Sequence, residues 1–446
     1  MSGGKLPEGW VKSDLDNILL SIIGGGTPSK AIPEYYQGDI PWMSVKDMNK
    51  HALTDTIDHI TSDAVENSST NVIPAGTPII ATRMSLGKIV TASFDSAINQ
   101  DLKALFLSRE VDRNFFIHWY RSQAQLIESL GTGTTVKGIR LEVLKTLTIN
   151  LPPLTEQKII AEKIDTLLAQ VDSTKARLEQ IPQILKRFRQ AVLASVVSGK
   201  LSKNTGQWKT YLLKNICISI SDGDHQAPPK SETGIPFLVI SDVNKGQIDF
   251  GNVSRWVPES YYESLKEIRK PCQNDILYTV TGSYGIPVIV NTTKPFCFQR
   301  HIAIIKPNSS LIDYKFLAFY LESPQIFKHA SDVATGTAQK TVSLSSLRNF
   351  ELSVPSLEEQ HEIVRCVEQL FAYADTIEKQ VNSALTRVNS LTQSILAKAF
   401  RGELTAQWRA ENPDLISGEN SAATLLEKIK AERATSGGKK TSRKKA

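Results

Sequence analysis

Two long stretches of the chain carry apolar residues at alternating steps of four and three positions. This spacing is the seam of a coiled coil, because it keeps one apolar stripe facing a partner helix. Thr174 alone interrupts the first seam. Two seams in one chain predict two long helices packed on each other as an antiparallel coiled coil. The seam positions are Ile160, Ile164, Leu167, Val171, Leu178, Ile181, Leu185, Phe188 and Val192, and then Ile363, Val367, Leu370, Ala374, Ile377, Val381, Ala384, Val388, Leu391 and Ile395.

Local signals predict where the two helices begin and end. Ser356 and Glu359 have the spacing of a capping box at the second start. Gly199 and Gly402 follow the last periodic residues as C-terminal stops. Because proline removes a helical hydrogen bond and clashes with the preceding turn, we expect a kink or break at Pro182. Roughly 37 helical residues would form a rod of about 55 Å, the length of about 16 base pairs of B-DNA.

The two stretches belong to an internal repeat, in which matching residues are 203 positions apart. No insertion interrupts this register between Thr132 and Leu201, and upstream the register drifts but persists. Each half therefore consists of a variable portion followed by a closely repeated portion, which gives the chain a pseudo-two-fold repeat. The matches include Thr132-Gly133-Thr134 with Thr335-Gly336-Thr337, Glu156-Gln157 with Glu359-Gln360, Trp10 with Trp208, Pro41 and Asp47 with Pro236 and Asp242, and Gln100 with Gln299.

The variable portions are typical of mixed α/β folds, because short β-rich runs alternate with Gly/Pro turns and helical stretches. The β-rich runs are 77–82, 276–280, 287–290 and 302–305, and the helical stretches are 115–120 and 314–321. The predicted fold class is α/β, with two globular mixed α/β domains separated by the two long helices. We expect a globular domain in 1–150, a central helical spacer in 151–203, a second globular domain in 204–353, a distal helical spacer in 354–407, and a partly helical, basic tail in 408–446.

Composition places the chain among soluble globular proteins, with 446 residues, 41% hydrophobic and 22% charged. No run approaches the roughly 20 apolar residues of a membrane helix, and the opening residues contain no signal-peptide core. We therefore expect a cytoplasmic protein without membrane contact. The four cysteines lack the spacing of a zinc or redox motif, so we expect reduced thiols and no metal site.

The formal net charge of +6 suggests a polyanionic partner until the charges are located. Most of this excess lies at the C-terminus, so that the rest of the chain is nearly neutral. A basic tail can contact DNA phosphates or can simply be solvated, and net charge does not separate these alternatives. The cations of the tail are Lys439, Lys440, Arg443, Lys444 and Lys445.

Motifs of catalysis are missing from the sequence. The nearest match to an adenine-methyltransferase motif, Asn150-Leu-Pro-Pro-Leu154, lacks the aromatic residue and has an extra leucine. The stretch 131–138 has the wrong spacing for a phosphate-binding loop, and no HExxH occurs. The seven histidines are isolated, which favours structural or surface roles. We therefore predict a chain without a catalytic centre.

Polar loops rich in hydrogen-bond donors are the remaining candidate chemistry. Arg, Lys, Gln and hydroxyl side chains can contact phosphates or read base edges in the major groove, although a merely flexible loop explains some of them equally well. The candidates of the first half are Thr27, Ser29, Lys30, Lys46, Thr82, Arg83, Ser85, Lys88, Gln100, Thr134, Thr135 and Lys137. Those of the second half are Asp224, His225, Gln226, Thr281, Ser283, Tyr284, Gln299, Arg300, His301, Thr337, Gln339 and Lys340.

Three stretches of the helical regions resemble the specificity subunits of type I restriction enzymes. They are PPLTEQKIIAEKID from Pro152, QILKRFRQAVL from Gln183 and SILAKAFRGEL from Ser394. The region 362–434 resembles the enteric K-type (type IA) members nearly letter for letter. The first ten residues share the resemblance, whereas the variable domains look like target-recognition domains only in kind.

The resemblance implies a division of labour within a larger enzyme. Each variable domain would read one half of a bipartite target in double-stranded DNA, and the helices would set the spacer. Two modification subunits, which bind S-adenosylmethionine and methylate adenine, would dock on the helices. Two restriction subunits would add ATP- and Mg-dependent translocation and cleavage. The chain itself would bind no cofactor.

Two other classes of protein remain as alternatives. A stand-alone methyltransferase would require the cofactor motif that the sequence lacks. A coiled-coil scaffold without DNA binding would account for the helices, but not for two dissimilar globular domains in matched positions.

Overall fold

The computed structural model describes residues 5–50, 52–202, 207–223 and 228–437. The chain forms two compact units, one of residues 1–177 with 385–446 and the other of residues 178–384. Each unit contains a mixed α/β domain and part of the two long helices, which confirms the predicted fold class.

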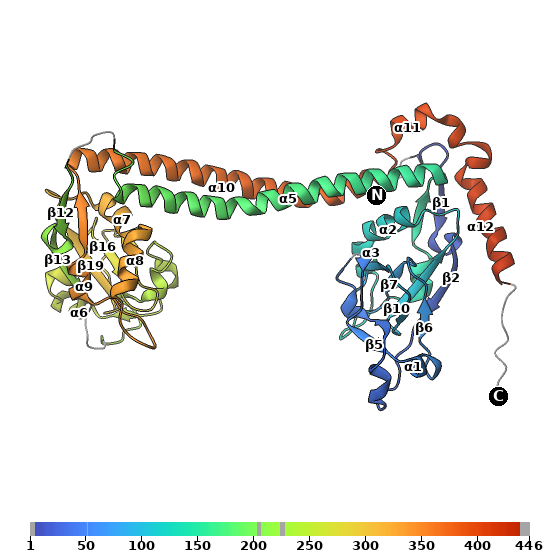
Figure 1. Ribbon diagram of the computed structural model, residues 1–446, viewed down its shortest axis with the longest axis horizontal. Coiled ribbons are helices and arrows are strands. Elements are labelled where there is room, and N and C mark those ends of the chain that lie inside the picture. The colour runs from blue at the N-terminus through green and yellow to red at the C-terminus, as the bar shows by residue number, and fades with distance from the viewer. Residues whose placement is uncertain (1–4, 51, 203–206, 224–227, 438–446) are drawn as a thin grey trace. The chain divides into compact units, whose positions relative to one another are not determined.

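The first unit contains a five-stranded sheet, a four-stranded sheet and a two-stranded pair (Figure 1). The five-stranded sheet has the order β2 (Leu19–Gly24), β10 (Leu102–Leu107), β7 (Ile79–Ala81), β8 (Ile89–Ala92) and β4 (Ala52–Leu53). The four-stranded sheet has the order β5 (Asp58–Ile60), β3 (Ile40–Met43), β9 (Ser96–Ile98) and β6 (Asn71–Ile73), and β1 (Val11–Asp14) pairs with β11 (Thr148–Leu151). The helices are α1 (Ser62–Glu66), α2 (Arg113–Ser122), α3 (Ala124–Ser129) and α4 (Leu141–Lys145), with short 3-10 helices η1 (Leu15–Ile18), η2 (Pro33–Tyr36) and η3 (Val45–Asp47).

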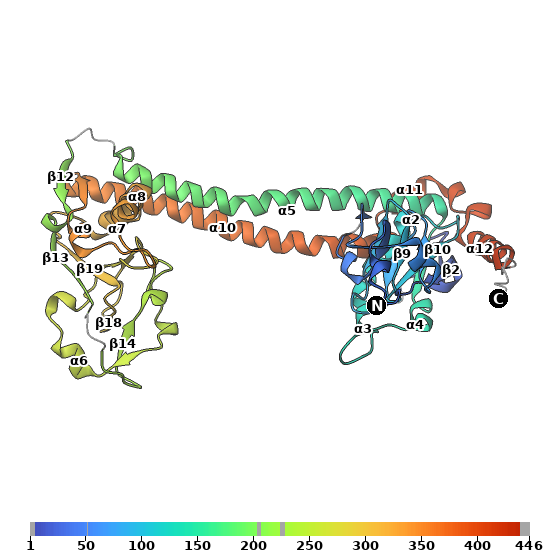
Figure 2. The same ribbon diagram turned by 60° about the horizontal axis from the view of Figure 1, so that its bottom comes forward.

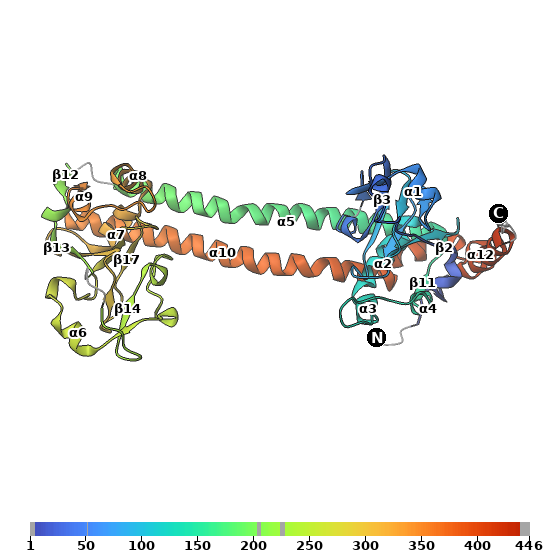
Figure 3. The same ribbon diagram turned by 90° about the horizontal axis from the view of Figure 1, so that it is seen from below.

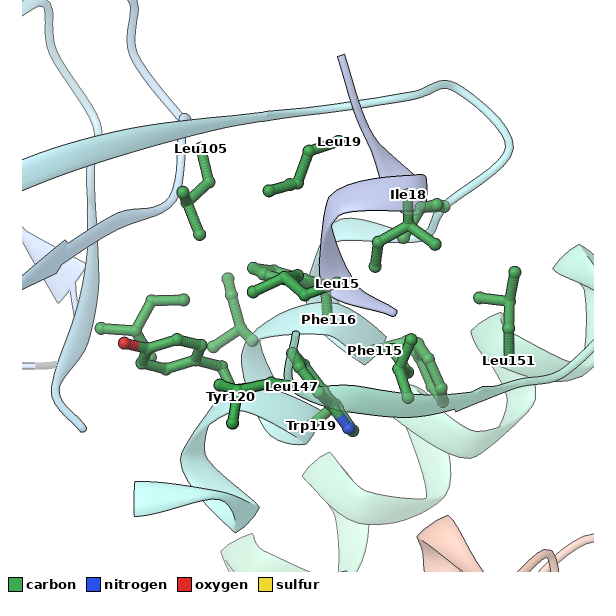
Figure 4. Close-up of a cluster of buried hydrophobic side chains, with 14 of the residues drawn as sticks. Leu15, Ile18, Leu19, Leu105, Phe115, Phe116, Trp119, Tyr120, Leu147 and Leu151 are labelled. Carbon is green, nitrogen blue, oxygen red and sulfur yellow. The ribbon is translucent and has the colours of Figure 1, made fainter. Parts of the chain in front are cut away.

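The core of the first unit lies between the five-stranded sheet and α2 (Figure 4). Phe115, Phe116, Trp119 and Tyr120 are almost completely buried, because they occupy the inner face of two turns of α2. Asp112 caps this helix by accepting a hydrogen bond of 2.8 Å from the N–H of Phe115. The cap and the aromatic face together fix α2 on the sheet.

The second unit repeats this plan with a four-stranded sheet, a three-stranded sheet and a two-stranded pair. The strand orders are β13 (Cys217–Asp222), β19 (Ile302–Pro307), β16 (Ile276–Thr279) and β17 (Pro287–Ile289); β15 (Trp256–Val257), β14 (Ile235–Leu238) and β18 (Cys297–Phe298); and β12 (Lys209–Leu212) with β20 (Glu351–Val354). The helices are α6 (Glu259–Ser264), α7 (Tyr314–Glu322), α8 (Pro324–Val333) and α9 (Leu344–Arg348), with 3-10 helices η4 (Leu213–Asn215), η5 (Ile240–Asp242), η6 (Phe250–Asn252) and η7 (Glu267–Arg269). Figure 3 shows α6 and β14 set apart from α9 and β13.

The β-rich runs and helical stretches predicted from the sequence are confirmed as elements. The runs at 77–82, 276–280 and 287–290 contain β7, β16 and β17, the run at 302–305 lies in β19, and the helical stretches lie in α2 and α7. The matched residues Asp47 and Asp242 have the same role. Each carboxylate accepts a 2.8 Å hydrogen bond from the backbone N–H three residues earlier, on Ser44 and Val239 respectively.

The two long helices are α5 (Leu154–Val197) and α10 (Leu357–Phe400), each of 44 residues. Of the kink or break expected at Pro182, the break is wrong, because α5 continues through this residue; the kink stays a prediction. Its ring is exposed, so the helix loses one hydrogen bond there without displacing a buried neighbour. Gly199 and Gly402 follow the two ends with φ of +69° and +76°, which confirms their prediction as helix stops.

Within each unit the two helices pack along the predicted seams. In the first unit Ile160 and Ile164 of α5 share a core with Leu396 of α10. In the second unit Val192 of α5 shares a core with Ile363 of α10. The early part of one helix thus meets the late part of the other, as in an antiparallel pair.

Most of the predicted seam positions are buried or partly buried, but Leu391 is not. Its side chain is 44% exposed, whereas Leu396 and Ala399 on the same helix are buried. A straight helix of 3.6 residues per turn drifts away from a repeat of 3.5 residues, so the buried stripe moves to other positions near the helix end.

The repeated Glu-Gln pairs attach the long helices to the domains. The indole N–H of Trp10 donates to Glu156 and that of Trp208 donates to Glu359, each at 2.8 Å. Only part of the capping box predicted at Glu359 appears among the described contacts, because the N–H of Glu359 donates to Ser356 while its carboxylate accepts from Trp208. The matched Trp and Glu residues therefore form the same bond in both units.

The glutamine of each pair bonds the first turn of the long helix to the start of a second helix. The side-chain oxygen of Gln157 accepts from the N–H of Asp112 at 2.8 Å, and that of Gln360 accepts from the N–H of Asp313 at 2.7 Å. Asp112 and Asp313 are the N-caps of α2 and α7. The aromatic helix of each domain is thereby fixed to its long helix.

The segment after α10 packs on the first unit. It contains α11 (Ala406–Glu411) and α12 (Ala422–Gly437), with 3-10 helices η8 (Pro413–Leu415) and η9 (Gly418–Asn420). Leu425 and Ile429 of α12 are buried, and Arg433 forms an ion pair with Asp16 at 3.1 Å. Arg409 reaches the buried carboxylate of Glu156 at 2.5 Å. The end of the chain is thus part of the unit that contains its beginning.

Candidate nucleic-acid interface

Four segments of the first unit meet at one end of the five-stranded sheet. They are the loop 24–30 after β2, the turn 82–88 between β7 and β8, the segment 99–101 before β10, and the loop 131–140, which Figure 2 shows between α3 and α4. We call them the first loop cluster. Gly25 lies so close to the end of β9 that an added Cβ would be 1.9 Å from the carbonyl oxygen of Ile98, so only glycine fits there.

Backbone hydrogen bonds join three of these segments. The N–H of Thr82 donates to the carbonyl of Asp101 at 2.8 Å, and the N–H of Ile139 donates to the carbonyl of Thr82 at 2.9 Å. The N–H of Met84 donates to the carbonyl of Lys137, also at 2.9 Å. One continuous surface is therefore formed by the turn 82–88, the segment 99–101 and the loop 131–140.

Side chains add further contacts across the first loop cluster. The hydroxyl of Thr27 donates to the side-chain oxygen of Gln100. The guanidinium of Arg83 lies 3.4 Å from the buried carboxylate of Asp101 and keeps 55% of its side chain exposed. The ammonium of Lys88 donates to Asn49 at 2.7 Å. The cations are thus held in place while their outer faces stay open to solvent.

The sequence candidates of the first half divide by exposure. Thr82 is buried, and its hydroxyl donates to the carbonyl of Asp101 at 3.0 Å, which leaves its side chain a structural role. Lys46 lies on η3, outside the cluster as defined, and pairs with Asp58 at 2.9 Å. Ser85 and Thr27 are partly buried. The exposed candidates are Ser29, Lys30, Lys46, Arg83, Lys88, Gln100, Thr134, Thr135 and Lys137.

The second unit contains the same arrangement of backbone bonds. The N–H of Val280 donates to His301, and the N–H of Val342 donates to Val280, each at 2.9 Å. The N–H of Gly282 donates to Lys340 at 3.0 Å. These bonds correspond one by one to those of Thr82, Ile139 and Met84. We call segments 221–223, 280–286, 299–301 and 334–342 the second loop cluster.

The candidates of the second half lie in this cluster or outside the described residues. Asp224, His225 and Gln226 lie outside them. Tyr284 stacks on Phe327, with ring centroids 5.8 Å apart and planes 11° apart, and its hydroxyl donates to Ser331. The exposed candidates are Ser283, Arg300, Thr337, Gln339 and Lys340, and the partly buried ones are Thr281, Tyr284, Gln299 and His301.

One sequence match is displaced by a residue in the structure. The N–H of Asn99 donates to Met43, and the N–H of Gln299 donates to Leu238, each at 3.0 Å. Gln299 is therefore the counterpart of Asn99 and not of Gln100, which corresponds to Arg300. The mismatch arises because the variable portions differ in loop length, so residue identity alone does not fix their register.

Electrostatics differ between the two clusters. Burial lowers the pKa of Lys103, which lies behind the first cluster and donates to the carbonyl of Gln100 at 2.8 Å. Burial, with a smaller contribution from the neighbouring charge of Arg300, lowers the pKa of His301 in the second cluster. A neutral imidazole can both donate and accept hydrogen bonds, whereas the corresponding position of the first cluster is the acceptor Asp101. The corresponding positions of the two clusters therefore differ in their donors and acceptors, with Asp101 buried and His301 partly buried.

Sequence reasoning missed residues whose importance depends on the tertiary structure. Asp101 is buried and holds both Thr82 and Arg83, but no motif in the sequence distinguishes it from other acidic residues. Met84 has a φ of +63°, and only the structure reveals this. The one signal in the sequence that could have identified Asp101 is that it directly follows the candidate Gln100.

Neither a cluster of metal-binding side chains nor a membrane-spanning helix is found in the described part of the chain. Within it, no three His, Cys, Asp or Glu side chains gather as a metal site would require. Among the same residues, no helix is both long enough and apolar enough to cross a bilayer.

Comparison with known proteins identifies relatives along the whole chain. The model of the type I restriction modification DNA specificity domain matches residues 7–183 and 206–387. The type I restriction enzyme EcoBI specificity subunit of Escherichia coli is 50% identical over 358 residues, covering 75% of this chain and 74% of that protein. The EcoKI specificity subunit of Escherichia coli strain K12 is 41% identical over 473 aligned positions, covering 100% of both chains.

A solved structure supports the fold. The crystal structure of the HsdS subunit from Thermoanaerobacter tengcongensis has a TM-score of 0.64 and 22% sequence identity, and covers 90% of this chain and 99% of that chain. Two domain matches that together span most of the chain, and full-length relatives of 41% identity, settle the family. The chain belongs to the type I restriction-modification DNA specificity family and is a specificity subunit of such a system.

Proposed function

We propose that each loop cluster reads one half of a bipartite target in double-stranded DNA. The observation that carries this proposal is the repetition of one backbone arrangement with different side chains. Arg83 of the first cluster corresponds to Thr281 of the second, and Gln100 corresponds to Arg300. Two different half-sites require the same backbone arrangement with different hydrogen-bonding side chains, because base edges differ in their donor and acceptor patterns.

The exposed side chains suit two kinds of DNA contact. Lys30, Lys88 and Lys137 can neutralise phosphates, which fixes the register of the protein on the duplex without reading sequence. Arg83 and Gln100 can form paired hydrogen bonds with base edges, each worth about 1–3 kcal/mol of discrimination. The hydrogen bonds inside the cluster orient these groups before DNA arrives, which reduces the entropy lost on binding.

The two long helices set the spacing between the half-sites and dock two modification subunits in this proposal. Each helix has 44 residues, and the same Trp–Glu and Gln contacts recur at the start of each. Two like surfaces in one chain offer two like partners equivalent places to bind. S-adenosylmethionine belongs to these modification subunits, and ATP and Mg belong to two restriction subunits, so the specificity subunit binds no cofactor.

The decisive experiment is adenine-methylation sequencing of the genome of a host that expresses this chain with type IA modification subunits. The expected result is a new split motif with methyladenine in both halves, absent from the host without the chain. If the complex assembles but no new motif is methylated, the proposal is overturned and a scaffold or a degenerate specificity subunit remains. Methylation by the purified chain alone would instead indicate a stand-alone enzyme.

The variant Arg83→Ala tests the assignment of one cluster to one half-site. We expect relaxed specificity in a single half of the motif, because only one cluster loses a donor, with about 1–3 kcal/mol less discrimination at the affected base pair. Arg109→Ala is the matched control, because Arg109 is exposed beyond the opposite end of β10. An unchanged motif in Arg83→Ala, or an equal change in both halves, would contradict the assignment.

A further inference from the structure

Met84 occupies an unfavourable backbone conformation at the surface of the first loop cluster. Its φ is +63°, and its side chain is 58% exposed. Among the described residues, only Met84 and Asn274 combine a side chain with a positive φ. Asparagine tolerates this region through its short polar side chain, whereas a bulky methionine is an outlier there.

Hydrogen bonds on both sides hold Met84 in this conformation. Its N–H donates to the carbonyl of Lys137 at 2.9 Å, and the N–H of Ser85 donates to the carbonyl of Arg83 at 2.8 Å. The second bond closes a three-residue turn centred on Met84, and such turns with positive φ are rare and strained. Strain of this kind persists where the surrounding structure enforces it, often at functional sites.

The second loop cluster has glycine at the corresponding position. Gly282 has a φ of +73°, and its N–H donates to Lys340 as that of Met84 donates to Lys137. Apart from Gly282 and its two chain neighbours, no described residue has an atom within 4 Å of the place where a Cβ would be at Gly282. The turn itself therefore needs no side chain, and the methionine of the first cluster is an addition to a frame that glycine would satisfy without strain.

The side chain of Met84 stands among polar and cationic groups. Arg83 precedes it, Ser85 follows it, and the loop containing Thr134, Thr135 and Lys137 is bonded to its backbone. A single exposed apolar residue is ordinary on a protein surface. It is unusual for an exposed apolar residue also to have a strained backbone and to lie on a surface suited to phosphates and base edges.

We propose that Met84 is a wedge that inserts into the base stack of the half-site read by the first unit. This inference rests on the proposed function. Apolar side chains, methionine among them, are used in this way by proteins that unstack base steps. When the target adenine is extruded towards a methyltransferase pocket, its place in the stack is left open. Met84 fills that opening and so favours the extruded state, as a positioning residue and not a catalytic one.

The test uses the complex of the full chain with its modification subunits and a duplex containing the motif found by methylation sequencing. Single-turnover methylation is measured separately for the adenine of each half-site. Met84→Gly keeps the turn and removes the side chain, Met84→Asn keeps the turn with a polar group, and Met84→Leu keeps an apolar side chain. Ile57→Ala, which removes another exposed apolar side chain of the first unit, is the control.

We expect Met84→Gly and Met84→Asn to slow methylation on the order of tenfold in one half-site, the one altered by Arg83→Ala, because apolar stacking on a base is lost. The other half-site should keep its rate, and Met84→Leu should restore at least part of the affected rate. With 2-aminopurine replacing the target adenine, the fluorescence increase that reports extrusion should shrink in the same half-site.

Three outcomes would overturn the proposal. They are an unchanged rate in both half-sites, an equal loss in both, and a Met84→Leu variant as slow as Met84→Gly. Thermal unfolding separates misfolding from function, because Met84→Gly should unfold no earlier than the wild type. Failure of the wild-type complex to methylate any split motif would count against the proposed function, independently of Met84.

Discussion

A few buried polar residues decide how each long helix meets its domain. The carboxylate of Glu156 is fully buried and accepts hydrogen bonds from Trp10, Thr405 and Arg409. The guanidinium of Arg409 also lies 5.7 Å from the centroid of the Trp10 ring. A buried carboxylate is tolerable only when donors replace its lost water, so these residues function as a group.

Removal of Glu156 should therefore cost far more than removal of an exposed acid. Glu156→Ala leaves the partly buried Arg409 without its carboxylate partner, and we expect the free energy of unfolding of the first unit to fall by about 3–5 kcal/mol. Glu162→Ala, an exposed position on the same helix, should change it by less than about 0.5 kcal/mol. Urea unfolding measures both.

A double-mutant cycle separates the ion pair from simple packing. Glu156→Leu with Arg409→Met should be less destabilised than the sum of the two single variants, since neither charge is then left buried alone. Additive effects would show that the two side chains do not interact in the folded protein.

At the level of single residues, the sequence predicts only part of the candidate DNA interface. Arg83 and Lys88 were predicted from residue type and are exposed. Thr82 was predicted from the same run but is buried, because its N–H and its hydroxyl both bond to the carbonyl of Asp101 at the start of the turn. Residue type does not distinguish these cases, since exposure depends on the strands and loops that pack around each position.

At the level of elements, the long helices show how far a periodic pattern can be trusted. The seam predicted Ile160, Ile164 and Ile363 as buried, and all three are completely buried. The pattern is informative because a helix packed on another must bury one stripe whatever the rest of the fold. Pro182 shows the limit of local rules, because the hydrogen bonds and packing of a long helix outweigh one unfavourable residue.

Replacing Pro182 with a residue that has a backbone N–H should consequently stabilise the folded protein. Pro182→Ala restores a backbone N–H to the interior of α5, and we expect the free energy of unfolding to rise by up to about 3 kcal/mol. The reciprocal change Leu385→Pro in α10 should lower it by a similar amount. Thermal unfolding of both variants, with the exposed Gln183→Ala as control, gives the comparison. Loss of stability in Pro182→Ala would mean that the proline ring makes contacts the helix needs.

At the scale of the whole molecule, the end of the chain completes the unit that contains its beginning. The N–H of Ala422 donates to the carbonyl of Gly9 at 3.2 Å, and Ile429 belongs to the core that contains Trp10. A side chain at Gly9 would collide with the carbonyl oxygen of Ile416, 2.7 Å from an added Cβ. The first unit is therefore assembled from both ends of the sequence, whereas the second is one continuous segment.

Truncation after Leu404 should destabilise the two units unequally. It removes Thr405 and Arg409 from Glu156 and exposes the core covered by Leu425 and Ile429, each worth about 1.5–3 kcal/mol when buried. We expect the melting transition of the first unit to fall by about 10 °C or more while that of the second unit is unchanged. Hydrogen exchange of β1 and β12 distinguishes the units. Equal protection of β1 in the truncated and full chains would contradict this role.

The sequence by itself determined the features that repeat. The heptad seams, the matched Trp, Glu and Gln residues and the glycine stops follow from local periodicity and from duplication, and each has a local physical cause that acts wherever the residue stands.

The tertiary structure alone decided which distant residues meet. The ion pairs of Arg83 with Asp101 and of Arg409 with Glu156 depend on the packing of segments far apart in sequence. The same is true of the finding that Asn99, and not Gln100, is the counterpart of Gln299. The strained conformation of Met84 likewise results from a bond to another loop. Such contacts are set by the three-dimensional balance of burial and hydrogen bonding, which a pattern along one chain does not record.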